Sequence, residues 1–274
     1  MTKAPRIASC FARLKAAGQT GLVAYLPVGY PTLQETPALV SAVIEGGASI
    51  VELGVPFSDP LADGATIQRA TAQALGQGVR LADCLEVAAR TRDRHPGVPL
   101  VFMGYYNTFL SYGLESFCDD AAQAGADGAI VVDLPPEEAD AFRDCSAAAG
   151  LDLIFLLAPT STEARIKKVA SVAQGFIYCV SVSGVTGARA ALPEYLPAFI
   201  AGVRAQTRLP LAIGFGVSLP EHVQAIGRFA EAAVVGSALV DVIDRSQPGE
   251  RASGLRAFVA GLVGVSTAKS RGDN

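Results

Sequence analysis

The feature that most constrains the fold is a regular alternation of short apolar segments and longer helix-forming segments along the whole chain. Eight of the apolar segments are rich in β-branched residues and are bounded by glycine, proline or polar turn residues, which predicts buried strands. A helix-forming segment follows each of them, and one more, with Ile7, Phe11 and Leu14 on one face, lies within residues 1–20. The predicted strands are residues 21–28, 49–55, 99–106, 128–133, 152–158, 176–182, 209–216 and 232–236.

The apolar pattern within these strands favours a parallel sheet with helices on its faces. The strands are continuously apolar rather than alternating, as expected when both faces of a sheet are covered. Eight strand–helix units in 274 residues fit a (β/α)8 barrel. A doubly wound open sheet is the alternative, but it expects a G-x-G-x-x-G motif after the first strand, which this chain lacks.

No segment of the chain has the composition of an interdomain linker. We therefore predict an α/β protein with a single (β/α)8 TIM barrel, including an extra N-terminal helix, over residues 1–265. Residues 266–274 are polar and are predicted to form a disordered tail.

Composition excludes several classes of protein. The chain is 50% hydrophobic with a formal net charge of −4, which argues against a nucleic-acid or anionic-membrane surface. It has no apolar run of the roughly 20 residues that a membrane span needs, and its start lacks a secretory h-region, so we expect a cytoplasmic protein. Five scattered cysteines without a C-x-x-C motif, and two distant histidines, predict reduced thiols and no metal site.

One predicted strand contains a carboxylate where an apolar residue is expected. Glu52 has hydrophobic neighbours on both sides, and burying an unpaired carboxylate costs several kcal/mol, so such a group usually protonates or has a function. Asp59 and Asp63 follow in the loop after this strand. Asp-Pro and Asp-Gly pairs also form turns, an explanation that stays open for both aspartates but does not account for Glu52.

Glycines gather at the ends of the last two predicted strands. Gly214 and Gly216 end one strand, and Gly236 and Ser237 end the other, directly before a helical segment. TIM barrels commonly bind phosphate at this place, because backbone N–H groups at a helix N-terminus point to one spot. Residues 183–187 would add further donors. The alternative is that glycine only relieves crowding at strand ends.

The remaining strand-end residues favour acid–base chemistry without a cofactor. The lysines fall in predicted helices or tails, which argues against a Schiff-base aldolase, and the histidines lie away from the strand ends, which argues against a metal-dependent one. Carboxylates, tyrosines and hydroxyls remain. The aromatic residues at these ends would each serve as barrel filling, but together they suit a flat aromatic substrate. They include Tyr25, Tyr105, Tyr178 and Phe215.

Three motifs of the chain together resemble one known family. Residues 52–64, ELGVPFSDPLADG, are similar to the signature of tryptophan synthase alpha subunits. So are residues 183–187, SGVTG, and residues 214–218, GFGVS, and the similarity runs in order from about residue 10 to residue 245. The resemblance is specific because a thirteen-residue motif and two further motifs occur in register.

The resemblance implies a lyase that cleaves indole-3-glycerol phosphate to indole and glyceraldehyde 3-phosphate by retro-aldol chemistry. It also implies a β-subunit partner in an α2β2 complex, with pyridoxal phosphate in the β subunit and no cofactor in this chain. A stand-alone lyase of the same family is an alternative. A phosphate-binding barrel that acts only as an allosteric or structural partner is another, against which the presence of both Glu52 and Asp63 argues.

By the same resemblance, individual residues take family roles. Glu52 and Asp63 match the catalytic carboxylates, and Asp59 falls in the loop that meets the β subunit. Tyr178 and Thr186 match residues that line and close the site. With the strand-end aromatic residues Tyr25, Tyr105 and Phe215, they are the expected substrate-binding residues. The expected phosphate-binding residues are Gly187, Gly216, Gly236 and Ser237.

A chemical reason supports the two carboxylates. Glu52, desolvated among apolar residues, should have a raised pKa and can protonate C3 of the indole. Asp63 would accept a hydrogen bond from the indole N–H and stabilise the developing positive charge. The chain departs from the family pattern at three positions: Ala65 in place of Pro, Tyr30 in place of Asp, and Val182 in place of Arg. Of these, Tyr30 and Val182 bear on loop closure and on contacts with a β subunit.

Overall fold

The computed structural model describes residues 5–180, 193–214 and 216–264, and within them it confirms the predicted barrel. Eight parallel strands hydrogen-bond in chain order, and β8 pairs with β1 to close the sheet. The strands are β1 (Gly21–Pro27), β2 (Ile50–Gly54), β3 (Leu100–Gly104), β4 (Gly128–Val131), β5 (Asp152–Leu157), β6 (Ile177–Val180), β7 (Leu211–Gly214) and β8 (Ala232–Val235).

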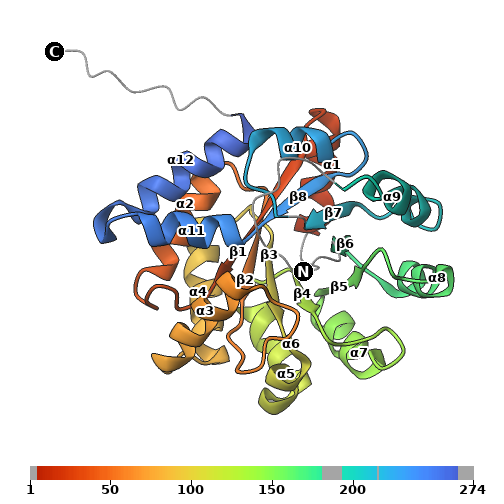
Figure 1. The fold of residues 1–274 in the computed structure, drawn as a ribbon. Coiled ribbons are helices and arrows are strands. Elements are labelled where there is room, and N and C mark those ends of the chain that lie inside the picture. The colour runs from red at the N-terminus through yellow and green to blue at the C-terminus, as the bar shows by residue number, and fades with distance from the viewer. Residues whose placement is uncertain (1–4, 181–192, 215, 265–274) are drawn as a thin grey trace.

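Helices surround this barrel as a ring (Figure 1). Those that follow the strands are α2 (Thr36–Glu45), α3 (Ala65–Gly76), α4 (Leu81–Arg94), α5 (Tyr106–Tyr112), α6 (Leu114–Gln123), α7 (Asp140–Ala149), α8 (Glu163–Val172), α9 (Leu196–Arg204), α10 (Pro220–Ile226), α11 (Ser237–Arg245) and α12 (Arg251–Val263). The predicted N-terminal helix is α1 (Arg6–Ala16), and a short 3-10 turn, Pro248–Glu250, precedes α12.

Helix α5 was not predicted, because Tyr106–Tyr112 combines aromatic residues with Asn, Thr and Ser, which are only moderate helix formers. Tertiary contacts compensate for the weak propensity. Phe109 is fully buried and packs 4.5 Å, centroid to centroid, from the ring of Phe117. Asp133, from the loop after β4, accepts a hydrogen bond of 2.7 Å from the first N–H of the helix, on Tyr106.

Side chains of the strands alternate between the barrel interior and the helix layer. Val23, Ile50, Val101 and Ile130 belong to the cluster that fills the interior. Glu52 lies two positions after Ile50 and is in register with Tyr25 of β1, so it also faces inwards. The interior is therefore apolar up to the level of this carboxyl group.

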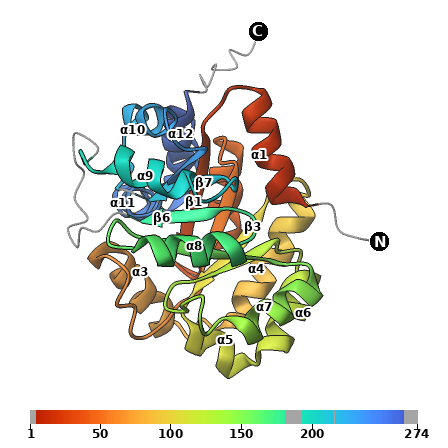
Figure 2. The same cartoon turned by 90° about the vertical axis from the view of Figure 1, so that its right-hand side faces the viewer.

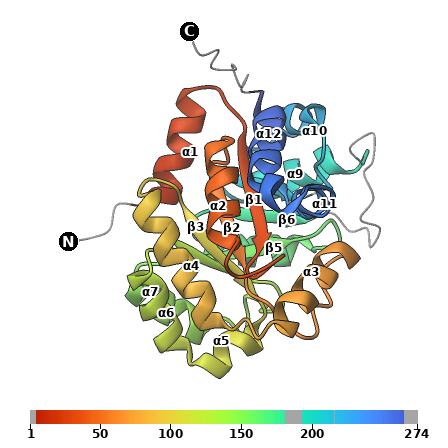
Figure 3. The same cartoon turned by 90° about the vertical axis from the view of Figure 1, so that its left-hand side faces the viewer.

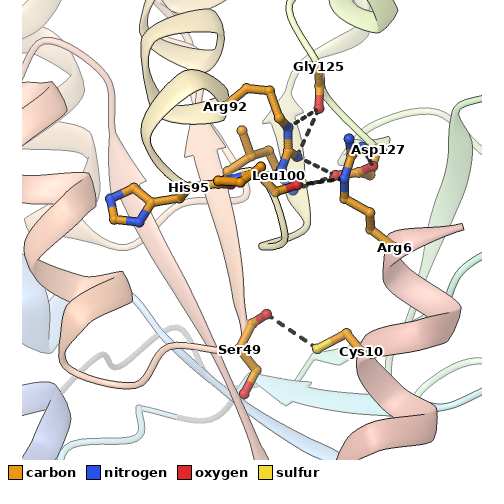
Figure 4. Close-up of polar contacts among 9 residues, drawn as sticks. Arg6, Cys10, Ser49, Arg92, His95, Leu100, Gly125 and Asp127 are labelled. Atoms are coloured by element: carbon orange, nitrogen blue, oxygen red, sulfur yellow. Dashed lines mark hydrogen bonds and ion pairs between the residues drawn. The ribbon is translucent and has the colours of Figure 1, made fainter. Parts of the chain in front are cut away.

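Helix α1 closes the amino end of the barrel. Phe11 packs against Phe176 with 5.8 Å between ring centroids, at the bottom of the interior cluster. Arg6 and Arg92 both bind the carboxylate of Asp127 at 2.8 Å, which ties α1 and α4 to the start of β4 (Figure 4). Cys10 donates to the carbonyl of Ser49 in the same view. Because these contacts cover the amino end of the barrel, we expect the functional groups at its other, carboxyl end.

The opposite end carries α3 and α11 next to each other. The two side views place α1 and α3 towards opposite ends of the barrel (Figure 2, Figure 3). Figure 3 also shows α11 beside α3, the helix that follows the loop of Asp59 and Asp63. Ala65 begins α3, so the helix forms there without the proline that the family pattern favours.

Candidate functional site

A cavity of about 200 Å³ opens at the carboxyl end of the barrel. Its walls come from the ends of β1, β3, β6, β7 and β8 and from the first turns of α3 and α11. The lining residues are Tyr25, Asp63, Thr66, Ile67, Met103, Tyr178, Gly214, Gly216, Val217, Ser218, Val234, Gly236, Ser237, Ala238 and Asp241. This is the end at which TIM barrels hold their functional groups.

Glu52 adjoins this cavity rather than lining it. Its side chain is fully buried, and neither carboxylate oxygen has a hydrogen-bond partner among the described residues. Burial without such a partner raises the pKa of Glu52 from 4.5 to about 8. At neutral pH the carboxyl group is therefore mainly protonated and can act as an acid.

Asp63 lies on the cavity wall at the end of the loop after β2. The hydroxyl of Tyr105 donates to its Oδ2 at 3.3 Å and accepts a 2.9 Å hydrogen bond from the N–H of Ala62. Phe57 stacks on the Tyr105 ring with centroids 4.9 Å apart. Burial raises the pKa of Asp63 to about 6, and the hydrogen bond from Tyr105 opposes part of this shift. At neutral pH Asp63 is thus mainly ionised.

The two carboxyl groups therefore differ in protonation at neutral pH, one neutral and one charged. Such a pair, with pKa values moved by their surroundings, can serve as a general acid and as an electrostatic stabiliser.

Two tyrosines reach into the cavity because glycines make room for them. A Cβ atom placed on Gly214 would lie 2.6 Å from the hydroxyl of Tyr178, and one on Gly54 would collide with the hydroxyl of Tyr25. Burial raises the pKa of both hydroxyls, and the charges of Glu52 and Asp63 raise them further. Both phenols therefore stay neutral and remain hydrogen-bond donors towards a ligand.

The N-terminus of α11 forms a further part of the cavity wall, next to Tyr25. Gly236 precedes the helix and Ser237 begins it, and both line the cavity together with Gly216 of the loop after β7. Gly216 has a φ of +51°, a conformation that glycine adopts without strain. The first N–H groups of a helix have no acceptor within it, so they are available to an anion here.

The structure places the remaining predicted residues as follows. Tyr105 contacts Asp63 and is not among the lining residues in the described part of the chain. Asp59 is exposed in the loop before α3, next to Leu61, which is 92% exposed. Thr186, Gly187, Phe215 and the departure Val182 lie outside the described residues.

Sequence reasoning missed several residues of the cavity wall. Thr66 and Ile67 of α3 and Asp241 of α11 line it from the first turns of these helices, positions that the strand ends alone do not indicate. Met103 is one position before the end of β3 and faces inwards, which strand alternation alone could have indicated. Phe155 is another aromatic residue near a strand end, but it belongs to the core cluster that includes the helix residues and does not line the cavity.

The histidines lie away from the cavity, and the cysteines are dispersed. His95 lies at the end of α4 and His222 is buried in α10. In the described ranges no group of three or more His, Cys, Asp or Glu side chains is placed to hold a metal ion. All five cysteines are free thiols. Within the same residues no helix is both long and apolar enough to cross a membrane.

Fold and site together define a class: a TIM-barrel enzyme in which a buried neutral carboxyl and a second, ionised carboxyl adjoin one cavity with a helix N-terminus on its wall. The family model described as "Tryptophan synthase alpha chain" matches residues 11–262. The chain belongs to the tryptophan synthase alpha chain family.

Individual relatives and solved structures support the same family assignment. The chain is 53% identical to the tryptophan synthase alpha chain of Roseiflexus sp. strain RS-1, over 94% of this chain and 99% of that one. It is 47% identical to that of Geobacter sulfurreducens, over 94% and 97%. The crystal structure of the alpha subunit from Legionella pneumophila superposes with a TM-score of 0.88 at 34% identity, covering 96% and 98% of the two chains. A Mycobacterium tuberculosis tryptophan synthase structure gives 0.89 at 37%, covering 96% and 98%.

Because the chain belongs to this family, the predicted lyase function is confirmed. Its alpha chains are lyases of tryptophan biosynthesis that cleave indole-3-glycerol phosphate. They need no cofactor of their own, since pyridoxal phosphate belongs to the β subunit with which they form α2β2 complexes. The stand-alone alternative is not favoured.

Proposed function

We propose that the cavity at the carboxyl end of the barrel cleaves indole-3-glycerol phosphate, with Glu52 as the proton donor and Asp63 as the group that binds the indole nitrogen. The observation that carries this proposal is the state of Glu52, a fully buried carboxyl with a pKa of about 8 and no partner for either oxygen in the described residues. Such a group holds its proton at neutral pH and can transfer it.

The first step prepares the indole ring to leave. Protonated Glu52 gives its proton to C3 of the indole, which places a positive charge on the ring. Asp63, ionised at neutral pH because its pKa is about 6, accepts a hydrogen bond from the ring N–H and stabilises that charge. Because Glu52 has no hydrogen bond to give up in the described residues, it can turn towards a bound substrate.

The second step breaks the carbon–carbon bond. Glu52, now ionised, removes the proton from the hydroxyl on the carbon attached to C3, and that carbon becomes the aldehyde of glyceraldehyde 3-phosphate. The electron pair of the broken bond returns to the ring, which leaves as neutral indole. Glu52 regains its proton, so no redox partner or cofactor takes part.

The phosphate would bind at the wall formed by α11. Gly216, Gly236 and Ser237 present backbone N–H groups and a hydroxyl at one end of the cavity. Gly187 belongs to this set through the family motif. Lysine is not needed here, because the positive end of the α11 dipole favours a phosphate.

The aromatic part of the substrate would lie between the two tyrosines and the Asp63 wall. Tyr25 of β1 and Tyr178 of β6 supply ring surface and neutral hydroxyls to the cavity. Thr186 and Phe215 complete the site by their match to the family motifs. Tyr105 is proposed to act on the substrate indirectly, by orienting Asp63.

The exposed loop of Asp59 and Leu61 is the proposed contact with the β subunit. Leu61 is 92% exposed on this loop, and such an apolar side chain suits a surface that a partner subunit covers. Asp63 lies at the end of this loop, so binding of the β subunit to the loop can directly affect the position of this carboxylate. We propose that the chain works in the cytoplasm within an α2β2 assembly.

The test is indole release from indole-3-glycerol phosphate by the purified chain, with and without a tryptophan synthase β subunit. Slow release that rises sharply when the β subunit is added supports the complexed lyase. Fast release that the β subunit does not change would favour the stand-alone enzyme. Folded protein that binds glycerol phosphate but releases no indole in either case would contradict the proposed chemistry.

A further inference from the structure

Three side chains from separate parts of the chain meet beside the cavity. Tyr30, in the loop after β1, donates its hydroxyl proton to Asp244 of α11. Arg69 of α3 donates to the same hydroxyl at 2.9 Å and forms an ion pair with Asp244. Its guanidinium also lies over the Tyr30 ring, 5.7 Å from the centroid. We call these three residues the α3–α11 bridge.

The two helices that the bridge joins are walls of the same cavity. Thr66 and Ile67 line it from α3, directly after Asp63 in the chain. Ser237 and Asp241 line it from α11. By the proposed function, the α3 wall recognises the indole and the α11 wall recognises the phosphate.

The position of the bridge along both helices follows from helical spacing. Arg69 is three residues after Thr66, and Asp244 is three residues after Asp241. Residues three apart share one helix face, one above the other. The bridge therefore lies about one turn beyond the cavity on both helices, on the faces that line it.

The loop of Tyr30 is itself fastened to α3. Gln73 and Gln77 of this helix donate to the carbonyl of Pro31 at 3.0 and 2.8 Å. Tyr30 is only 5% exposed, whereas Arg69 is half exposed. The hydroxyl of Tyr30, on a side chain that is mostly buried, is therefore the firmest link from the Tyr30 loop and α3 to α11. The more exposed Arg69–Asp244 ion pair adds little by itself.

We propose that the α3–α11 bridge is a positioning device that sets the spacing between the indole-binding and phosphate-binding walls, so that both ends of one substrate are bound at once. The proposal rests on the proposed function, because it assigns the two walls to the two ends of the substrate. Tyr30, one of the departures from the family pattern, gains a specific role: its phenol donates to a carboxylate and accepts from a guanidinium together.

Three ligands separate positioning from general stability. Indole occupies only one wall, glycerol 3-phosphate only the other, and an indole joined to phosphate by a three-carbon alkyl chain spans both without being cleaved. Calorimetric Kd values for all three are measured with the full chain and with Tyr30→Phe, which keeps the buried ring and removes the hydroxyl. Arg256→Gln is the matched control, since it breaks a half-exposed ion pair from α12 to Glu45 of α2 that touches neither wall.

We expect Tyr30→Phe to weaken the spanning ligand about three- to tenfold, the loss of one hydrogen bond to a charged group, and to change either fragment less than about twofold. KM for indole-3-glycerol phosphate rises in parallel. Asp244→Asn, which weakens the same contact from α11, gives the same pattern if Tyr30→Phe folds poorly. Arg256→Gln leaves all three Kd values unchanged.

Unchanged binding of the spanning ligand by both bridge variants would overturn the inference and leave the proposed function intact. Equal weakening of all three ligands would also overturn it, because a loss of general stability does not distinguish the ligands. If the unmodified chain binds the spanning ligand no more tightly than the fragments, the assignment of the two walls fails, and the proposed function fails with it.

Discussion

Replacing Glu52 with glutamine removes the acidic proton of this residue and keeps its size and neutral charge. At pH 7 the carboxyl is mainly neutral because burial raises its pKa to about 8, and glutamine is neutral and of similar size. The substitution therefore fills the same buried space without a transferable proton. We expect kcat for indole-3-glycerol phosphate cleavage to fall about 10²-fold or more.

The same substitution should stabilise the protein, by an amount that depends on pH. Between pH 4.5 and 8 the unfolded chain has lost the Glu52 proton while the folded chain keeps it, so the free energy of unfolding falls as pH rises. The loss accumulates at about 1.4 kcal/mol per pH unit and reaches about 3 kcal/mol at pH 7 and about 5 kcal/mol above pH 8. Glu52→Gln avoids this loss.

Steady-state indole release tests the expected loss of kcat. Denaturant unfolding at pH 5, 7 and 9 tests the expected gain in stability. Glu45→Gln is the control, because Glu45 is a half-exposed carboxylate paired with Arg256. We expect the stability gain of Glu52→Gln to grow from pH 5 to pH 9, and the control to show no such growth. Near-normal turnover would refute the role of Glu52 as acid, and a stability difference independent of pH would refute its raised pKa.

The remaining predictions concern the second carboxyl, its support and the amino end of the barrel. The pH profile of kcat/KM should be bell-shaped, with apparent pKa values near 6, where Asp63 ionises, and near 8, where Glu52 loses its proton; a flat profile from pH 5 to 9 would contradict the assignment. Tyr105→Phe removes a hydrogen bond that lowers the pKa of Asp63, so the acidic limb should move to higher pH and kcat should fall several-fold; an unmoved limb would argue against this support. Asp127→Asn leaves two arginines without their carboxylate and should cost about 2 to 4 kcal/mol in urea unfolding, with kcat of the folded protein unchanged. A loss below about 0.5 kcal/mol would show that this ion-pair network adds no stability.

The barrel could be predicted from the sequence because each of its strands is specified by a short stretch of neighbouring residues. Each is a continuous apolar run between turn residues, and the structure places all eight within a few positions of the prediction. Glu52 could be singled out for the same reason, since one charge in such a run is visible without knowledge of the fold.

The parts that could not be predicted depend on contacts between distant residues. Helix α5 forms because Asp133 accepts from its first N–H and buried Phe109 anchors it, neither of which local propensity contains. Tyr30 and Asp244 are 214 positions apart and Tyr105 and Asp63 are 42 apart, so their pairing appears only once the barrel closes. The structure adds a hydrogen bond from Tyr105 to Asp63, and the substrate contact of Tyr105 stays a prediction.

The most direct test of the account is the pKa of the Glu52 carboxyl itself. Carbon-13 NMR of the protein labelled at glutamate carboxyls follows each group through a pH titration, and the resonance that disappears in Glu52→Gln identifies this one. We expect a midpoint near pH 8, because the group is fully buried and neither of its oxygens has a hydrogen-bond partner among the described residues. A midpoint at or below pH 5 would mean that Glu52 is ionised at neutral pH, and it would contradict the proposal that this residue supplies the proton.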